Sequence, residues 1–247
     1  MPFTLTRVPL EPRRRRITVR AVEDLGPHYR RVTFEGADLL GFDSPGADDH
    51  IRIFLPPPGG RLPASLEGIE LASREFTPAA FDGERLAIDF VLHGGGAASD
   101  WAERAGPGDE VLVGGPRGSM RIEGRPDWWL LAGDLTALPA IRRFLGDVPA
   151  EAAVDVIVLA EDPADERALG PVGGRRVAWV RSLDGLVAAL DEAPARAGEG
   201  FAFIAAEQGV VKPARAWLER RGVGPDHAVV KGYWREGLTA DAPKAPQ

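Results

Sequence analysis

The stretch WWLLAGDLTALPAI at residues 128–141 places the strongest constraint on how this chain can fold. Its apolar residues run unbroken from 128 to 132, as in a parallel strand buried on both faces, and the run stops at Gly133. A helix is predicted next, because apolar residues recur at three- and four-residue spacing from Leu138 and Pro139 falls in the first turn. Such a turn points backbone N–H groups and the positive end of the helix dipole at one place, which favours a phosphate, although many similar turns bind nothing.

The rest of the second half repeats this alternation of strand and helix. Strands are predicted at residues 128–132, 154–160, 176–180, 201–205 and 228–231, and helices near residues 139–145, 183–190 and 211–221. Alternation of this kind is typical of a parallel sheet with helices on both faces, which is a nucleotide-binding architecture.

The first half has a different pattern, in which short strands are separated by turn residues. Strands are predicted at residues 17–22, 29–34, 50–55, 85–93 and 110–114, with one short helix within residues 97–105 that starts near Ser99. This pattern predicts a small closed antiparallel β-barrel. The predicted fold class is therefore β plus α/β, with a barrel domain at residues 1–123 and a parallel-sheet domain with a C-terminal extension at residues 124–247.

Composition narrows the range of functions. The chain has no cysteine, which excludes a disulfide, a thiolate nucleophile and a cysteine-bound iron–sulfur cluster. Its four histidines lack the spacing of metal ligands, and neither a G-x-S-x-G elbow nor a Walker loop occurs, so we predict no catalytic side chain and no metal site. The net charge of -7 argues against nucleic acid or a membrane as partner.

The arginines at residues 13–16 are interpreted as a solvated lead-in to the first strand, with a specific binding role as the alternative.

A small barrel followed by a nucleotide-type sheet can hold a flavin on the barrel and a nicotinamide dinucleotide above the sheet, with the two rings meeting in a cleft. Four stretches make this interpretation specific: REFTP at residues 74–78, DFVLHGGGAASDWA at 89–102, GDLTALPAI at 133–141 and KGYWREG at 231–237. With these stretches in this order, the chain resembles the siderophore-interacting protein family over about residues 17–237. Members of that family are flavin-dependent ferric-siderophore reductases of the ferredoxin-reductase-like superfamily.

The resemblance implies that FAD binds non-covalently to the barrel domain. Phe76 would stack on the isoalloxazine, Thr77 would hydrogen-bond its polar edge, and Arg74 would lie near the phosphates or the ribityl chain. The other residues implied at the flavin are Pro78, Val91, Leu92, His93, Gly94, Ala98, Ser99 and Trp101, where small residues allow a close approach and the helix offers N–H groups to the pyrophosphate. As alternatives, Phe76 is a core residue and Arg74 a surface charge, and Trp101 either covers the adenine or fills the gap between barrel and helix.

Four positions depart from the family pattern. Relatives usually have Tyr at the position of Phe76, Arg at Ala79, Pro at Ala97 and Glu at Leu135. The missing arginine matters most, because a charge-assisted contact to phosphate is worth about 1.5–3 kcal/mol, or roughly ten- to a hundredfold in affinity. The sequence therefore predicts weak binding of FAD.

The electron donor implied by the resemblance is NADH or NADPH. Its pyrophosphate would bind to the turn made of Gly133, Asp134, Thr136 and Ala137, and Glu207 would lie near the nicotinamide. The acidic residues that follow the predicted strand at residues 154–160 would repel a 2′-phosphate and favour NADH. Arg181, at the end of the next predicted strand, would favour NADPH. An acidic loop that is simply solvated is the remaining alternative.

Further candidate residues lie near the carboxyl end, in the last predicted strand and just after it. Tyr233 and Trp234 would cap the other face of the flavin and leave when the nicotinamide enters, or else pack the last strand against the barrel. Positive charge for an anionic ferric siderophore would come from His50, Arg52, Lys231 and Arg235.

The predicted function is the reduction of ferric siderophores by NAD(P)H through FAD, in which a monomer releases Fe(II) in the cytoplasm. The alternative is a degenerate family member that binds FAD weakly or not at all and acts as a non-catalytic ligand- or partner-binding protein. A flavin spectrum and NAD(P)H oxidation separate the two.

Overall fold

The computed structural model describes residues 3–65 and 68–237, which form two compact units. The barrel unit is Arg7–Arg121, and the α/β unit consists of the described residues of Met1–Thr6 and Ile122–Gln247. Each unit is described by itself.

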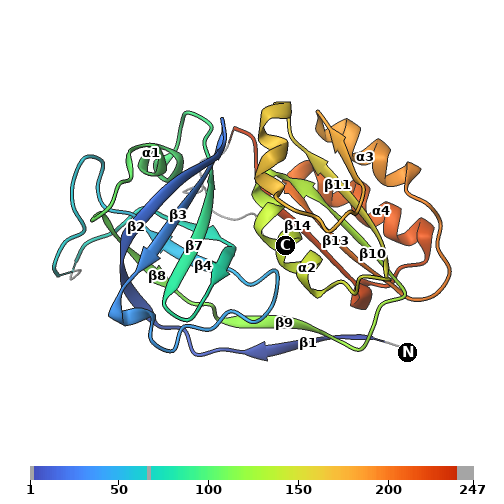
Figure 1. Cartoon of the computed structure of the whole chain (residues 1–247), viewed down its shortest axis with the longest axis horizontal. Helices are drawn as coiled ribbons and strands as arrows, with labels where there is room; N and C mark the ends of the chain where they lie inside the picture. The colour runs from blue at the N-terminus through green and yellow to red at the C-terminus, as the bar shows by residue number, and fades with distance from the viewer. Residues whose placement is uncertain (1–2, 66–67, 238–247) are drawn as a thin grey trace. The chain divides into compact units, whose positions relative to one another are not determined.

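The barrel unit is built on one antiparallel sheet of seven strands in the order β5-β4-β8-β2-β3-β7-β6 (Figure 1). These strands are β2 (Arg14–Gly26), β3 (Tyr29–Glu35), β4 (Ile51–Phe54), β5 (Ser73–Phe76), β6 (Pro78–Phe81), β7 (Arg85–Val91) and β8 (Glu110–Gly114). The two edge strands, β5 and β6, follow each other in the chain with only Thr77 between them, so chain continuity brings the two edges together and curls the sheet. The predicted small antiparallel barrel is confirmed, although no ladder joins β5 to β6 within the described part of the chain.

The core of the barrel unit comes from the inward side chains of this sheet. Ile17, Val32, Phe34, Ile88 and Phe90 are buried in one apolar cluster, as expected from strands in which alternate residues face inward. Helix α1 (Ala97–Arg104) joins this cluster, and a short 3₁₀ helix, η1 (Ala37–Leu39), follows β3. The predicted short helix is therefore present, beginning two residues before Ser99.

The α/β unit contains a five-stranded parallel sheet in the order β12-β11-β10-β13-β14, as predicted. Its strands are β10 (Trp128–Asp134), β11 (Ala153–Leu159), β12 (Val177–Val180), β13 (Gly200–Glu207) and β14 (Ala228–Trp234). Its helices are α2 (Leu138–Asp147), α3 (Leu183–Glu192) and α4 (Val211–Arg221), with 3₁₀ helices η2 (Leu135–Ala137), η3 (Pro163–Leu169), η4 (Gln208–Val210) and η5 (Pro225–His227). None of the helices in the described part of the chain is long and apolar enough to cross a membrane.

Helices cover both faces of the parallel sheet (Figure 1). On one face, Phe144 of α2 packs against Phe201 and Phe203 of β13, with ring centroids 5.2 and 5.0 Å apart. On the other face, α3 and α4 pack Leu186 and Trp217 into a cluster with the alternate residues of β10 and β13. Every residue of β10 is buried, which explains its unbroken apolar sequence.

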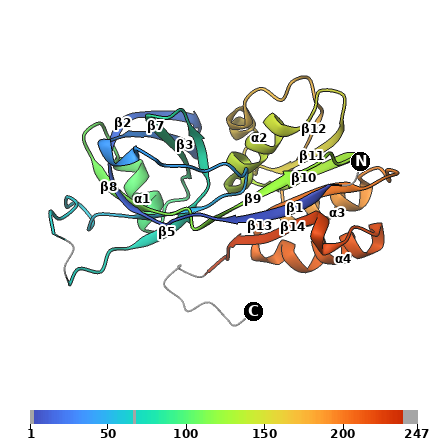
Figure 2. The same cartoon turned by 90° about the horizontal axis from the view of Figure 1, so that it is seen from below.

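The first described residues belong to the α/β unit. Strand β1 (Thr4–Pro9) pairs with β9 (Gly118–Glu123) in a two-stranded sheet (Figure 2). Phe3 is buried, and its ring lies 6.3 Å from that of Phe201 and 4.5 Å from that of His227. The two compact units thus meet in the chain between Arg121 and Ile122, and the described residues up to Thr6 belong to the α/β unit. The short strands β1 and β9 were not predicted.

The interpretation of the arginines at residues 13–16 as a solvated lead-in is wrong for Arg15, whereas Arg13 and Arg14 are exposed. Strand β2 already begins at Arg14, and Arg15 is only 5% exposed. Its guanidinium donates hydrogen bonds to the carbonyl oxygens of Gly115 at 3.2 Å and Gly41 at 3.3 Å, and it lies 5.4 Å from the centroid of the Phe42 ring. Because backbone carbonyls and an aromatic face replace water around this charge, the arginine can be buried in the barrel.

Candidate functional site

The REFTP stretch connects the two edge strands, β5 and β6, of the curled sheet in the barrel unit. Phe76 ends β5, Pro78 begins β6, and Thr77 between them is 7% exposed. The Phe76 ring is partly buried and lies 4.7 Å from the ring of Phe90, tilted by 48°. Phe76 thus packs against the core, as the alternative interpretation stated, while part of its surface stays accessible. An edge of the barrel with an aromatic ring and a hydroxyl group suits a flat heteroaromatic ligand.

The second candidate element is the glycine-rich loop in front of α1. Gly94 and Gly96 have φ values of 64° and 89°, and no described atom would lie within 4 Å of a Cβ at Gly94 or Gly95. No side chain of the described residues caps the first turn of α1, so its N–H groups remain available to an acceptor. This observation fits the pyrophosphate of FAD.

The hydroxyl of Ser99 has a different role from its backbone. Its Oγ accepts a hydrogen bond from the His93 N–H at 3.1 Å and donates one to Glu103 at 3.3 Å. These bonds fix the loop from 93 to 99 against α1. Ser99 is 2% exposed, and its hydroxyl is engaged in these two bonds, so the hydroxyl is not offered to a ligand. The spacing of Ser99 and Glu103 by four residues was the sequence signal for this contact.

The remaining flavin candidates divide between core and loop. Trp101 is 9% exposed and packs 5.6 Å from Phe90 and 6.1 Å from Phe34, so the structure favours the core-filling alternative for this ring. Leu92 packs against the same core, and its N–H donates to the His28 carbonyl at 2.8 Å. The other candidates are placed as follows: Val91 ends β7, Ala98 lies in the first turn of α1, and Arg74 lies in β5 with its guanidinium donating to the Ser73 carbonyl at 2.9 Å.

The carboxyl edge of the parallel sheet contains the strand-to-helix turn. The chain fills the sheet in one direction from β10 to β12 and in the other through β13 and β14, so the topological switch point lies between β10 and β13. Open α/β sheets bind ligands outside the carboxyl ends of the strands at this point. At the end of β10, a Cβ on Gly133 would lie 2.3 Å from the Ala205 carbonyl oxygen and 2.5 Å from the Ala137 Cβ. Glycine is therefore required for the turn to pack against β13, and the turn leads through η2 into α2.

Asp134 is the most heavily hydrogen-bonded group at this edge. One carboxylate oxygen accepts from the Thr136 N–H at 2.9 Å and from the Thr136 hydroxyl, and the other accepts from the Glu207 N–H at 3.0 Å and the Trp234 Nε1–H at 2.8 Å. Burial raises the pKa of Asp134, and these hydrogen bonds oppose the rise. Four donors fill the acceptor sites of a carboxylate, so Asp134 organises the turn and has no acceptor site left for a ligand.

Glu207 holds the C-terminal segment to the same edge. Its carboxylate accepts from the Gly209 N–H and, at 3.4 Å, from the Glu236 N–H. A Cβ on Gly232 would lie 2.1 Å from the Gln208 side-chain oxygen, so glycine lets the Gln208 side chain pack on β14. The predicted position of Glu207 at the end of its strand is correct, but the sequence contained no signal for these contacts with the chain beyond β14.

Acidic and basic groups that bear on the choice of nicotinamide lie beyond β11 and β12. Arg181 donates to the Ala160 carbonyl at 2.6 Å and forms an ion pair with Glu166. Asp162 caps η3 by accepting from the Ala164 N–H at 2.8 Å. Arg181 is thus in direct contact with the acidic loop that follows β11.

The four predicted substrate residues are distributed over both units. In the barrel unit, His50 directly precedes β4 and Arg52 lies within it, where Arg52 forms an ion pair of 2.7 Å with Glu75. Lys231 lies in β14 and Arg235 follows it in the α/β unit, where Arg235 is exposed. The Glu75 partner was not predicted, and it reduces the positive charge that Arg52 can offer.

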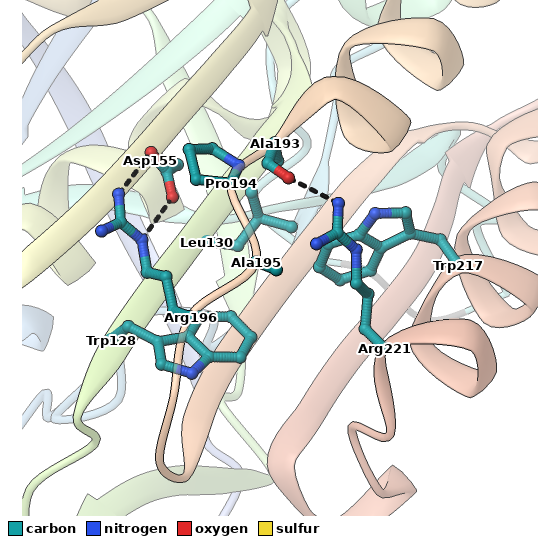
Figure 3. A pocket seen from close by; sticks show the side chains of 9 residues that line it. All are labelled: Trp128, Leu130, Asp155, Ala193, Pro194, Ala195, Arg196, Trp217 and Arg221. Carbon is teal, nitrogen blue, oxygen red and sulfur yellow. Dashed lines mark hydrogen bonds and ion pairs between the residues drawn. The ribbon is translucent and has the colours of Figure 1, made fainter.

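A separate small cavity of about 60 Å³ lies in the α/β unit near the amino ends of β10 and β11 (Figure 3). It is lined by Trp128, Leu130, Asp155, Ala193, Pro194, Ala195, Arg196, Trp217 and Arg221. Its guanidinium groups are engaged, since Arg196 binds both oxygens of Asp155 at 2.9 Å and Arg221 donates to the Ala193 carbonyl. This volume holds a few water molecules, and the cavity is far too small for a dinucleotide.

Comparisons with known proteins agree with this geometry. Residues 126–237 match the family model described as siderophore-interacting protein, and residues 18–120 match that of the siderophore-interacting FAD-binding domain. The chain is 33% identical over 243 residues to the NADPH-dependent ferric-chelate reductase of Escherichia coli (strain K12), an alignment that covers 92% of this chain and 95% of that protein.

Two further relatives extend the comparison. The chain is 28% identical over 233 residues to the ferric vibriobactin reductase of Vibrio cholerae, with 86% of each chain covered. A siderophore utilization protein from T. fusca has the same fold, with a TM-score of 0.86 and 30% identity over 95% of this chain and 97% of that one. The chain belongs to the siderophore-interacting protein family.

Proposed function

We propose that this protein reduces ferric siderophores with electrons from NADH or NADPH, using non-covalently bound FAD. The observation that carries this proposal is the uncapped first turn of α1 behind Gly94 and Gly96, within the segment that matches the FAD-binding domain model. The relatives named above as ferric-chelate and ferric vibriobactin reductases support the reaction type.

In the barrel unit, the chain's own residues would bind and orient FAD. The Phe76 ring would contact one face of the isoalloxazine, and the Thr77 hydroxyl would bond its polar edge. The N–H groups of Ala98 and Ser99 would bind the pyrophosphate, with the helix dipole adding to the attraction. When bound, FAD supplies the conversion of a two-electron hydride transfer into single-electron steps.

In the α/β unit, the turn after β10 would orient the dinucleotide. Gly133 allows the turn to lie against β13, and Asp134 fixes Thr136 and the end of β13 in one arrangement. The N-terminus of α2 would then face the pyrophosphate across the turn. No side chain is needed as a general acid or base, because hydride and electron transfer require only position.

The iron of the siderophore is the substrate. Anionic oxygen ligands attract Fe(II) less strongly than Fe(III), since the Coulomb energy falls with the charge of the ion. One-electron reduction therefore favours release of the metal. We propose further that the protein does this as a monomer in the cytoplasm, which size-exclusion chromatography and cell fractionation test.

The test is a titration of the purified protein with FAD, followed by absorbance of the flavin. A bound-flavin spectrum is expected, followed by oxidation of NADH or NADPH and formation of Fe(II) when a ferric siderophore is added. Comparing the initial rates with the two nucleotides identifies the donor. A protein that yields no flavin spectrum with excess FAD would overturn the proposal.

One observation favours a second candidate function. Ala79, at the position where the family resemblance implies arginine, is 8% exposed and brings no charge to the barrel. A relative that has lost flavin chemistry and binds a ligand would show this feature. It would bind a ferric siderophore, measured by fluorescence quenching, without any oxidation of NAD(P)H.

A further inference from the structure

Trp234 combines a fixed indole edge with an exposed ring. Its Nε1–H donates to Asp134 at 2.8 Å, yet the residue is 46% exposed, which is unusual for a large apolar side chain held by a hydrogen bond to a buried group. Trp234 ends β14 and pairs with Glu207 in the register of β13 and β14. The exposed ring is therefore presented at the carboxyl edge of the sheet, beside the switch point.

The carboxylate that holds this ring, that of Asp134, is buried and all its acceptor sites are occupied. Asp134 accepts four hydrogen bonds from Thr136, Glu207 and Trp234, and it is 6% exposed. One carboxylate thus ties together the ends of β10, β13 and β14. A side chain that sits at the dinucleotide edge but has no remaining acceptor site can act only by placing its neighbours.

Charged groups lie on both sides of the switch point. On the side of β11 and β12, Arg181 lies at the strand end and is paired with Glu166 of the acidic loop. On the side of β13 and β14, the exposed indole lies beside Glu207, whose carboxylate accepts from the Glu236 N–H, and Glu236 adds a second exposed carboxylate. Arg235, which follows Trp234 and is also exposed, offsets one of these carboxylates, so the attraction for a planar cation comes mainly from the ring quadrupole.

We propose that Trp234 is the aromatic platform for the nicotinamide ring, that it binds the positively charged oxidised ring more strongly than the neutral reduced ring, and that Asp134 is the positioning residue that fixes it. This inference rests on the proposed use of NAD(P)H. The platform belongs to the α/β unit and stays there, because its hydrogen bond is made within that unit.

The direct test is calorimetric titration of the FAD-loaded, oxidised protein with NAD+ and with NADP+. Trp234→Ala should weaken binding of the preferred nucleotide about tenfold, the value of a cation–π contact in a partly desolvated site, and Trp234→Phe, which keeps a ring but loses the hydrogen bond to Asp134, should bind with an affinity between those of Trp234→Ala and wild type. The matched control is Trp128→Phe, which makes the same chemical change at the amino end of β10, where Nε1 has no hydrogen-bond partner among the described residues. This control should bind like wild type.

Two readouts separate positioning from a general loss of structure. In steady state, the ratio of the inhibition constant of the oxidised nucleotide to the KM of the reduced one should rise several-fold in Trp234→Ala, since the contact favours the cation. Asp134→Asn should weaken nucleotide binding more in the wild-type background than in the Trp234→Ala background, because only its bond to Trp234 is lost with the ring, while its bonds to Thr136 and Glu207 remain to be broken in both.

The outcomes decide between the proposals. If wild-type protein binds neither NAD+ nor NADP+, the proposed function and this inference both fail. If wild type binds and Trp234→Ala binds equally well, only the inference is overturned. Equal losses for the oxidised and reduced nucleotides would likewise overturn it, because a merely structural role predicts no preference.

Discussion

Replacement of Gly133 by alanine tests whether the strand-to-helix turn depends on close packing. The new Cβ would lie 2.3 Å from the Ala205 carbonyl oxygen and 2.5 Å from the Ala137 Cβ. One neighbour is the backbone of a central strand and the other a single methyl group, so neither can rotate away. Overpacking usually lowers the free energy of unfolding by about 1–3 kcal/mol. Because both neighbours are rigid here, we expect a loss at the upper end, about 3 kcal/mol. Nucleotide affinity should fall as well, because β10 and β13 must separate at the switch point.

The assay is urea unfolding followed by tryptophan fluorescence, which reports on the α/β unit because all tryptophans except Trp101 lie there. Gly146→Ala is the matched control. Gly146 lies in α2, and no described atom would be within 4 Å of its Cβ. Alanine should therefore stabilise the helix by about 0.5–1 kcal/mol. If Gly133→Ala unfolds within 0.5 kcal/mol of wild type, as judged against the typical effect of a neutral surface change, the packing argument is refuted.

Three further perturbations have defined outcomes. Ala79→Arg should strengthen FAD binding by about ten- to a hundredfold in a spectrophotometric titration, whereas Ala80→Arg, exposed on the opposite face of β6, should leave it unchanged. Arg31→Met removes two hydrogen bonds from the Asp89 carboxylate, whose side chain has no exposed surface, and should cost about 3–5 kcal/mol in urea unfolding; a cost below 1 kcal/mol would contradict this. Burial raises the pKa of Asp134, so the folded protein takes up this proton at a higher pH than the unfolded chain. Wild type should therefore gain stability relative to Asp134→Asn as the pH falls from 7 towards 4, and a constant difference would contradict the argument.

Local patterns predicted most of the fold. The unbroken apolar run of β10 and the spacing of apolar residues in α4 identified both elements, because burial on two faces or on one stripe leaves a direct trace in the sequence. Strands β1 and β9 left no such trace, since each is short and half exposed. The burial of Arg15 was not predicted for a related reason: the carbonyl oxygens that accept hydrogen bonds from its guanidinium belong to residues that are distant in sequence.

The sequence predicted which segments form the candidate site, but not which side chains in them contact one another. The positions of Gly133 and Glu207 at strand ends follow from the pattern and from the family resemblance, whereas the last strand was predicted to end at residue 231 and in fact runs to Trp234. The partners of these residues do not follow from the sequence, because the bond from Trp234 to Asp134 joins residues 100 positions apart and depends on how five strands are ordered. The roles of these side chains toward FAD and the nucleotide stay predictions that the experiments above test.

The position of Phe3 has a consequence for how the chain is made. Its ring completes the packing around Phe201 and His227, although some 200 residues of synthesis separate it from these partners. On the ribosome, the barrel, which is continuous in sequence, can fold before the segment around Phe3 has its packing partners. A fragment starting at Ile122 would lack this ring and lose about 3–5 kcal/mol of packing, so cutting the gene at the obvious junction should not yield an intact second half.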